Sequence, residues 1–214
     1  MKNKSNFKKI FYDLNEVKIL EKKENSSKIK YENFIFELTS SAKYDILNAL
    51  ASIKTAKLEN YSDEEIQKGL LAFQNVEFRN EVIKSNSGAI IISDCYNANP
   101  DSAKLSLQHI SETYKDKKII VVFGDMFELG EFEEEYHRQI GKFINSLNVN
   151  YFVSVGKLAK MTFEEVKNID KKFFDTINEA AEFLPEIMNE KSVVFLKASR
   201  GMKFEKIVEI IREK

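Results

Sequence analysis

Polar side chains follow a short apolar stretch in the middle of the sequence. Residues 89–93 are mostly apolar, Asp94 follows them directly, and Asn97 and Asn99 come within five residues more. A carboxylate only accepts hydrogen bonds, whereas a primary amide both donates and accepts. Together these side chains could bind a ribose, another sugar or a peptide. Asp and Asn are also ordinary turn residues ahead of a helix, so a structural role stays open.

A second polar group follows the apolar stretch at residues 192–197, where Ser199 and Arg200 precede a helical pattern over residues 202–212. Free backbone N–H groups at a helix N-terminus, together with a guanidinium, favour an anionic ligand. A plain helix cap beside a solvated arginine is an equal alternative.

Metal and nucleophile chemistry have weaker support. His137 follows an acidic stretch at residues 131–135, but the only other candidates for a zinc site are His109 and Cys95. Catalytic zinc normally has three protein ligands, so we expect His137 to lie on a solvated helix face. Cys95 has no evident activating base and is expected to be a small buried residue.

The elements that position these residues alternate from residue 78 onward. A hairpin pairs residues 78–84 with 89–93, and strands are then expected at 118–123, 151–155, 173–175 and 192–197, separated or followed by helices at 101–114, 132–147, 159–168, 178–188 and 202–212. This alternation predicts an α/β fold, a Rossmann-like, mostly parallel sheet with flanking helices. Ligands bind beyond the carboxyl ends of such strands. The polar segments at 94–100, 124–130, 156–157 and 197–202 should therefore share one sheet edge.

The chain before residue 77 has a different pattern. Short alternating stretches at 17–20, 29–31 and 34–38 predict antiparallel strands, and apolar spacing over 44–58 predicts an amphipathic helix. Ser62 and Glu65 form a capping-box pattern for a second helix that should end near Phe73. We therefore expect a partial α/β piece over residues 1–76 and a separate domain over 77–214, with the boundary at 75–78.

Composition excludes several classes of function. With 33 basic and 34 acidic side chains the net charge is -1, which does not favour nucleic acid as a partner. No apolar run approaches the about 20 residues that cross a membrane, and the N-terminus does not resemble a signal peptide, so a cytoplasmic location is expected. No phosphate-binding loop or nucleophile-elbow motif occurs, so the sequence predicts a binding edge without catalytic residues or metal ligands of its own.

The motifs at the strand ends resemble those of a known family. Residues 94–102, 124–130, 154–157 and 197–202, with a His-x-x-x-Gly motif from His137, occur in the order found in the Mur ligases. The resemblance runs from about residue 45 to the C-terminus. Tyr-Asn-Ala-Asn and Gly-Asp-Met-x-Glu-Leu-Gly are most similar to the members that join D-alanyl-D-alanine to UDP-N-acetylmuramoyl-tripeptide.

The resemblance implies an ATP-dependent amide ligase of peptidoglycan synthesis that activates the tripeptide carboxylate as an acyl phosphate with Mg²⁺. Residues 1–76 would be the end of the central ATP-binding domain, and 77–214 the whole C-terminal domain. The phosphate-binding loop, Mg²⁺ ligands and UDP-sugar domain would be absent with the upstream part, so the chain should not ligate alone. It would be a truncated or split-gene fragment, or an assembly partner would supply the other half. Alternatives are a non-catalytic module that binds dipeptide or nucleotide, and a receiver-like domain phosphorylated at Asp94 or Asp125.

The resemblance also implies nucleotide-binding residues. Asn48 would contact adenine, although Asp45 stands where relatives usually have an asparagine, and an ionised Asp cannot donate a hydrogen bond. Arg79 would reach the ATP phosphates when the domains close. Asp94 would accept hydrogen bonds from the ribose hydroxyls, and Tyr96 would pack beside the nucleotide.

Substrate-binding residues are implied in the same way. Asn97 and Asn99 would orient the dipeptide or the acyl phosphate, while Ser199 and Arg200 would hold the dipeptide carboxylate. Ala198 replaces the usual glycine of this motif, and its methyl group is expected to narrow the pocket.

Overall fold

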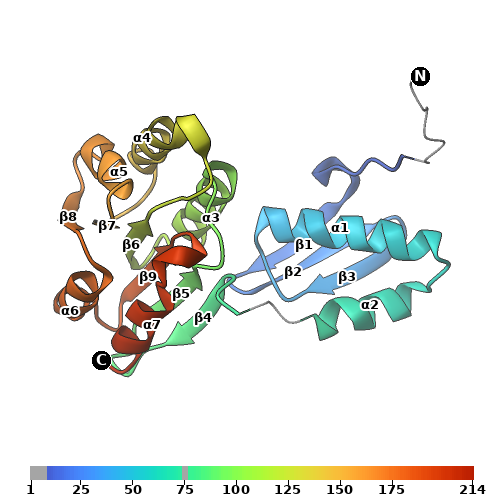
Figure 1. Cartoon of the computed structure of the whole chain (residues 1–214). Helices are drawn as coiled ribbons and strands as arrows, with labels where there is room; N and C mark the ends of the chain where they lie inside the picture. Colours follow the sequence, from blue (N-terminus) through green and yellow to red (C-terminus); the bar gives the residue numbers. More distant parts are fainter. Residues whose placement is uncertain (1–8, 74–76) are drawn as a thin grey trace, which may run out of the picture. The chain divides into compact units, whose positions relative to one another are not determined.

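The computed structural model describes residues 9–73 and 77–214, which fall into two compact units, residues 1–74 and 75–214 (Figure 1). The expected boundary at 75–78 begins on residues outside the described ranges. Within these ranges no helix is long and apolar enough to span a bilayer. Each unit has its own sheet and its own buried core.

The smaller unit is a three-stranded antiparallel sheet with two helices on one face (Figure 1). Its elements are η1 (Leu14–Glu16), β1 (Lys18–Lys23), β2 (Ser26–Tyr31), β3 (Phe34–Leu38), α1 (Lys43–Leu58) and α2 (Asp63–Ala72). Alternate residues of β2 and β3 pack on the helices, and the core includes Ile29, Phe36, Ile46, Leu50 and Ile53. The antiparallel strands and both helices expected from the sequence are confirmed.

Local signals set the ends of α2. The Ser62 hydroxyl accepts the N–H of Glu65, and the Glu65 carboxylate accepts the N–H of Ser62, so the expected capping box is present. Two of the free N–H groups at the helix start are satisfied in this way. Phe73 is extended and ends the helix where the sequence predicted.

The larger unit is a six-stranded sheet in the order β4-β5-β9-β6-β7-β8, in which only β4 is antiparallel. The expected mostly parallel sheet is confirmed. Its strands are β4 (Glu81–Lys84), β5 (Ile90–Asp94), β6 (Lys118–Gly124), β7 (Tyr151–Val155), β8 (Asp170–Phe174) and β9 (Ser192–Lys197). Its helices are α3 (Pro100–Thr113), α4 (Glu133–Ile144), α5 (Ala159–Glu165), α6 (Ile177–Ile187) and α7 (Glu205–Arg212), with 3-10 turns η2 (Gly130–Phe132) and η3 (Arg200–Met202).

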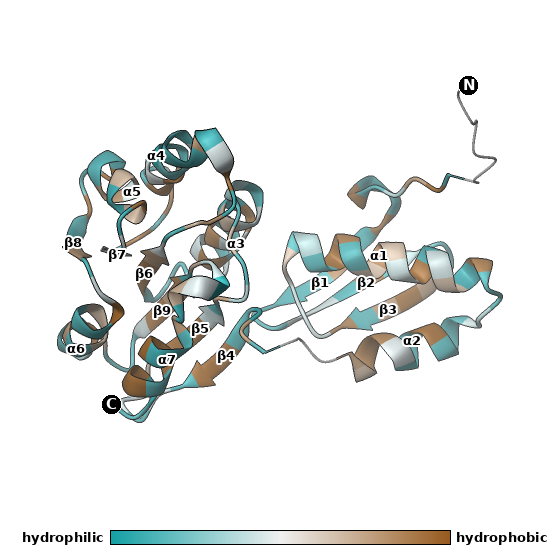
Figure 2. Cartoon of the chain, in the orientation of Figure 1, coloured by the Kyte–Doolittle hydropathy of each residue, from teal (hydrophilic) through white to brown (hydrophobic). Residues whose placement is uncertain are grey.

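Both faces of this sheet are covered. The helices α3, α4 and α5 contribute to one buried cluster and α6 and α7 to the other. Hydrophilic and hydrophobic segments alternate along α7 in Figure 2, and its buried side chains are Ile207, Val208 and Ile211. Such two-sided coverage explains why β6 and β9 consist largely of buried apolar residues.

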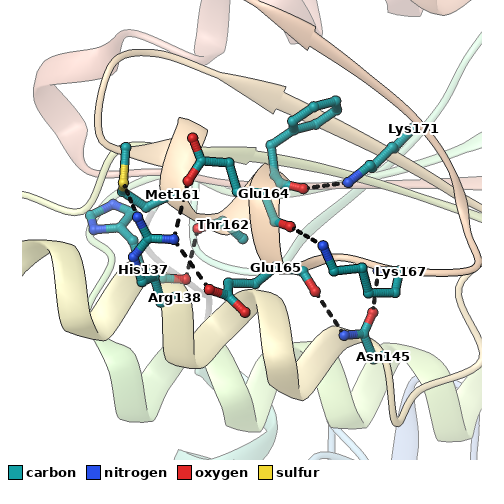
Figure 3. A network of polar contacts seen from close by, with 10 residues as sticks. His137, Arg138, Asn145, Met161, Thr162, Glu164, Glu165, Lys167 and Lys171 are labelled. Carbon is teal, nitrogen blue, oxygen red and sulfur yellow. Dashed lines mark hydrogen bonds and ion pairs between the residues drawn. The ribbon is translucent and has the colours of Figure 1, made fainter.

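The helix expected at 159–168 is shorter in the structure, because its last carbonyl groups are bound by side chains (Figure 3). The Lys171 ammonium donates to Phe163 O and Val166 O, both at 2.6 Å. The Asn145 amide donates to Glu165 O at 2.9 Å. These donors satisfy carbonyls that would otherwise bind the next helical turn.

The helix expected at 202–212 also starts later than predicted. A 3-10 turn comes first, and Lys203 then takes a left-handed backbone conformation with φ 56° before α7 begins at Glu205. The expected strand at 173–175 begins three residues earlier and ends one residue earlier, as β8.

Candidate functional site

The polar segments meet at the carboxyl edge of the larger sheet, as expected. Lys197 at the end of β9 pairs in register with Asp94 at the end of β5 and with Phe123 near the end of β6. Gly124 pairs with Val155 at the end of β7. The segments after β5, β9, β6 and β7 therefore leave the sheet side by side.

Asp94 is buried and bound on one of its two carboxylate oxygens. Its Oδ2 accepts hydrogen bonds from Lys197 Nζ at 2.6 Å and from Ser106 Oγ at 2.9 Å. Its Oδ1 has no partner among the described residues, and it is not one of the fully enclosed unpaired atoms. Asp94 therefore offers a single open acceptor at the sheet edge.

The sequence analysis assigns no individual role to Lys197, which begins the polar segment 197–202, or to Ser106. Lys197 is buried, with its side chain 3% exposed. The signal in the sequence is a lysine that ends an otherwise apolar strand, since a fully buried lysine is rare unless paired. The serine gives no such signal, because one more serine on an amphipathic helix is ordinary.

Two arginines stack on aromatic rings near the end of β5. The guanidinium of Arg79 lies 4.4 Å from the centre of the Tyr96 ring, and that of Arg200 lies 4.7 Å from the centre of the Phe78 ring. The carbonyl of Phe78 accepts the N–H groups of Cys95 and Tyr96, which joins these residues to the end of β5. Neither arginine has a carboxylate partner among the described residues, so both can receive an anionic group.

Asn97 and Asn99 are exposed, and each already uses its side-chain oxygen. Asn99 Oδ1 accepts the N–H of Ser102 at 2.8 Å and forms the N-cap of α3, so the structural role left open by the sequence is present. Asn97 Oδ1 accepts the N–H of Ala98 at 2.8 Å. The amide N–H₂ groups of both remain for a ligand, and ligand binding by either residue stays a prediction.

The expectation that Ser199 and Arg200 lie at the N-terminus of the helix over 202–212 is wrong, whereas anion binding by either residue stays a prediction. Ser199 and Arg200 lead into η3 rather than into α7, and the Ser199 N–H donates to Asp125 O at 3.0 Å. The Ser199 hydroxyl accepts the N–H of Phe127 at 2.8 Å. Ser199 therefore fixes the segment after β6, while Arg200 remains free to bind a ligand.

The prediction that the Ala198 methyl narrows the pocket is also wrong. Ala198 is fully buried in the core. A Cβ added at Gly124 would lie 2.8 Å from the Ala198 Cβ, so this methyl faces the end of β6 rather than a ligand.

His137 is buried, and the expectation of a solvated helix face is wrong. Its Nδ1 donates to Glu133 O at 2.6 Å, and its Nε2 accepts the N–H of Met126 at 2.9 Å. Burial lowers the pKa of this imidazole. A neutral ring with the proton on Nδ1 fits both contacts, and it holds the segment after β6 in place.

Asp125 is likewise committed to a structural contact. Its Oδ1 accepts the N–H of Ala159 at 2.7 Å at the start of α5, and burial raises the pKa of this carboxyl. Gly156 has φ +104°, and a Cβ there would lie 2.7 Å from Asp125 Oδ1. The glycine of the segment after β7 is needed for this close approach.

Cys95 is buried, as expected. Its thiol donates to Leu196 O at 3.4 Å, and burial raises its pKa to about 12. A thiol of such high pKa is a poor nucleophile at neutral pH.

Asn48 belongs to the smaller unit. It is exposed on α1, and its backbone carbonyl accepts the hydroxyl of Ser52. Asp45 Oδ2 accepts the hydroxyl of Ser40 at 2.6 Å near the start of the helix. A contact between Asn48 and adenine stays a prediction.

The fold and the edge together define an α/β domain with polar and cationic groups at the carboxyl ends of parallel strands, the place where ligands bind in sheets of this kind. Residues 78–200 match the family model described as Mur ligase, glutamate ligase domain. This match covers more than half of the chain, which therefore belongs to the Mur ligase family.

Individual relatives have one specificity in common. The UDP-N-acetylmuramoyl-tripeptide–D-alanyl-D-alanine ligase of Bacillus subtilis is 33% identical over 80% of this chain and 38% of its own length. The enzyme of the same name from Buchnera aphidicola subsp. Baizongia pistaciae is 35% identical over 79% of this chain and 37% of its own. The chain spans less than half the length of these relatives.

Solved structures agree with this assignment. A crystal structure of MurF from Acinetobacter baumannii superposes with a TM-score of 0.82 at 27% identity, covering 93% of this chain and 45% of that chain. The similarity therefore extends over most of both units.

Proposed function

We propose that this chain is the C-terminal portion of an ATP-dependent ligase that joins D-alanyl-D-alanine to UDP-N-acetylmuramoyl-tripeptide. The observation that carries the proposal is the 33% identity to a ligase of that name over 80% of the chain. Residues 1–76 would be the end of the central ATP-binding domain and 77–214 the C-terminal domain. We expect the protein in the cytoplasm.

The strand ends offer groups suited to a nucleotide. Asp94 Oδ1 is an open acceptor for a ribose hydroxyl, and the ring of Tyr96, 42% exposed, lies beside the unpaired guanidinium of Arg79. ATP, when bound, supplies the phosphoryl group that activates the tripeptide carboxylate. Arg79 would pair with its phosphates, and Asn48 would contact the adenine. Among residues 9–73 and 77–214 no group of three or more His, Cys, Asp and Glu side chains could hold a metal ion. We expect the Mg²⁺ ligands in the upstream part of the ligase, as the resemblance implies.

The same edge would receive the dipeptide. The guanidinium of Arg200 is the group suited to a carboxylate, and the Phe78 ring beneath it limits its movement. The amide N–H₂ groups of Asn97 and Asn99 would donate to carbonyl oxygens of the dipeptide or the acyl phosphate. Closure of the missing domains over this edge would exclude water from an acyl phosphate that otherwise hydrolyses.

Phosphate release from ATP tests this proposal. The purified chain is supplied with Mg²⁺, UDP-N-acetylmuramoyl-tripeptide and D-alanyl-D-alanine, alone and with a polypeptide that carries the phosphate-binding loop and the UDP-sugar domain. We expect release only in the mixture, and only with both substrates. Because no phosphate-binding loop occurs in this sequence, a second candidate is a non-catalytic module. Binding of D-alanyl-D-alanine with no release under any condition would favour that module and contradict the ligase.

A further inference from the structure

The carboxylate of Asp94 forms a buried ion pair through its second oxygen, Oδ2. Lys197 on β9 and Asp94 on β5 have side chains that are 3% and 8% exposed, and their charged atoms are 2.6 Å apart. Ser106 on α3 adds a hydrogen bond to the same oxygen. Three separate elements therefore converge on Asp94 Oδ2.

Stability alone gives little reason for this arrangement. Moving two charges out of water costs free energy that their attraction only roughly recovers, and well-packed apolar residues are often as stable. Apart from Ser93 and Ser192, the other residues of β5 and β9 are apolar, so an apolar pair would fit there. The charged pair stands at the strand ends, next to the site.

These contacts also fix the orientation of the carboxylate. Two donors bind Oδ2, which leaves Oδ1 as the oxygen that can accept a hydrogen bond from a ligand. A carboxylate accepts stronger hydrogen bonds than a neutral group does. Removal of Lys197 would take away one of the two donors and let the carboxylate rotate.

We propose that Lys197 is a positioning residue, which with Ser106 turns Asp94 so that its Oδ1 accepts a hydrogen bond from a ribose hydroxyl. This inference rests on the proposed nucleotide site. Lys197 itself touches neither substrate nor nucleotide; it acts through Asp94.

Selectivity for the ribose hydroxyls separates this role from a purely structural one. Affinities of the full chain for ATP and for 2′,3′-dideoxy-ATP are measured by saturation-transfer NMR, which detects weak binding. We expect the native chain to prefer ATP by about tenfold, the size typical of one hydrogen bond to a charged acceptor. Lys197→Met should reduce this preference to about twofold or less, Ser106→Ala should reduce it partly, and Lys197→Arg should restore part of it.

Lys118 provides the matched control. It is a half-buried lysine on β6 of the same sheet, but at the opposite end of the strands, and its ammonium donates to Ile187 O at 2.8 Å. Lys118→Met should keep the full preference for ATP. If Lys197→Met does not fold, as judged by circular dichroism, Ser106→Ala and Lys197→Arg decide the question.

The outcomes distinguish the two proposals. Absence of ATP binding by the native chain, or a preference that survives Asp94→Ala, which removes both acceptor oxygens, overturns the nucleotide site and the role of Lys197 with it. A preference lost in Asp94→Ala but kept in both Lys197→Met and Ser106→Ala overturns the positioning role alone.

Discussion

The two units differ in how many faces of their sheet are buried. The larger unit buries both faces of six strands, whereas the smaller unit buries one face of three. Its edge strand β1 contains no buried residue. Ten of the sixteen exposed large apolar side chains in the described ranges lie in the smaller unit, although it is the shorter of the two. Since burial of apolar surface drives folding, we expect it to be the less stable unit.

The units also differ in what they bury besides apolar groups. In the larger unit the charged or titratable groups Asp94, Lys197, Asp125 and His137 are buried, and each has a hydrogen-bond partner. In the described part of the smaller unit the buried polar side chains are serines. A polar group without a partner is costly in a core, so such networks need elements that are fixed from both sides. A sheet covered on both faces can therefore hold buried charged groups in fixed positions, which the smaller unit does not do in its described part.

Truncation of one core phenylalanine in each unit should have the largest effect. Phe36 and Phe195 are both fully buried, and a buried phenylalanine cut to alanine costs roughly 3–5 kcal/mol. Phe36→Ala should unfold the smaller unit and leave the larger one folded, while Phe195→Ala should weaken the larger unit only. Hydrogen exchange with mass spectrometry measures the protection of backbone amides in both units in one experiment. A loss of protection in both units after Phe36→Ala would contradict the expected difference in stability, because the units would then unfold together.

Close packing at the end of β6 gives the next largest effect. A Cβ at Gly124 would lie 2.5 Å from the Phe204 ring, which is fully buried and cannot move away. Gly124→Ala should therefore cost the larger unit about 1–3 kcal/mol. The matched variant is Gly201→Ala, whose Cβ would lie 2.9 Å from the ring of Phe127, a side chain that is 40% exposed and can turn aside. Urea unfolding should show a clearly smaller loss for Gly201→Ala, and equal losses would contradict the packing argument.

Local patterns in the sequence were sufficient where a structure depends on neighbouring residues. The capping box at Ser62, the strands at 151–155 and 192–197 and the shared sheet edge all follow from spacing and from the geometry of parallel strands. The roles assigned to ligand-binding residues remain predictions, since they depend on molecules that contact this edge.

Features that depend on distant residues were not predictable in this way. Asp94 and Lys197 are 103 positions apart, and only the completed sheet brings their charges together. The acidic residues before His137 predicted a solvent-exposed helix face. The ring is instead buried, and its Nε2 accepts the N–H of Met126 on another segment. The early end of α5 depends on donors from Asn145 and Lys171, which lie outside that helix.

Acid should weaken the larger unit before the smaller one. Burial lowers the pKa of His137 below the 6.5 of an exposed imidazole. Below about pH 6.5 the unfolded chain therefore binds a proton that the folded unit excludes, so stability falls as the pH drops through this range, by at most about 1.4 kcal/mol per pH unit for one proton. The smaller unit has no histidine and should be insensitive between pH 7 and pH 6.

The variant His137→Gln identifies the titrating group, with urea unfolding of the larger unit followed as a function of pH. Glutamine keeps an acceptor for the N–H of Met126, so the dependence on pH should flatten. Burial raises the pKa of Asp125, which contributes with the opposite sign because the folded unit binds that proton first. A slope that survives His137→Gln would show that another group is responsible.

The smallest effect should be a gain, in the less stable unit. Gly69 lies within α2, and a Cβ there would meet no atom within 4 Å. Alanine in a helix is favoured over glycine by about 0.5–1 kcal/mol, so Gly69→Ala should stabilise the smaller unit by that amount. Gly141 is the matched helical glycine of the larger unit, but its Cβ would lie 2.5 Å from Thr162 O and 2.7 Å from Glu165 Cβ, so Gly141→Ala should destabilise. Hydrogen exchange should show slower exchange confined to residues 9–73 for Gly69→Ala. Slower exchange in the larger unit as well would mean that the smaller unit limits the stability of the whole chain.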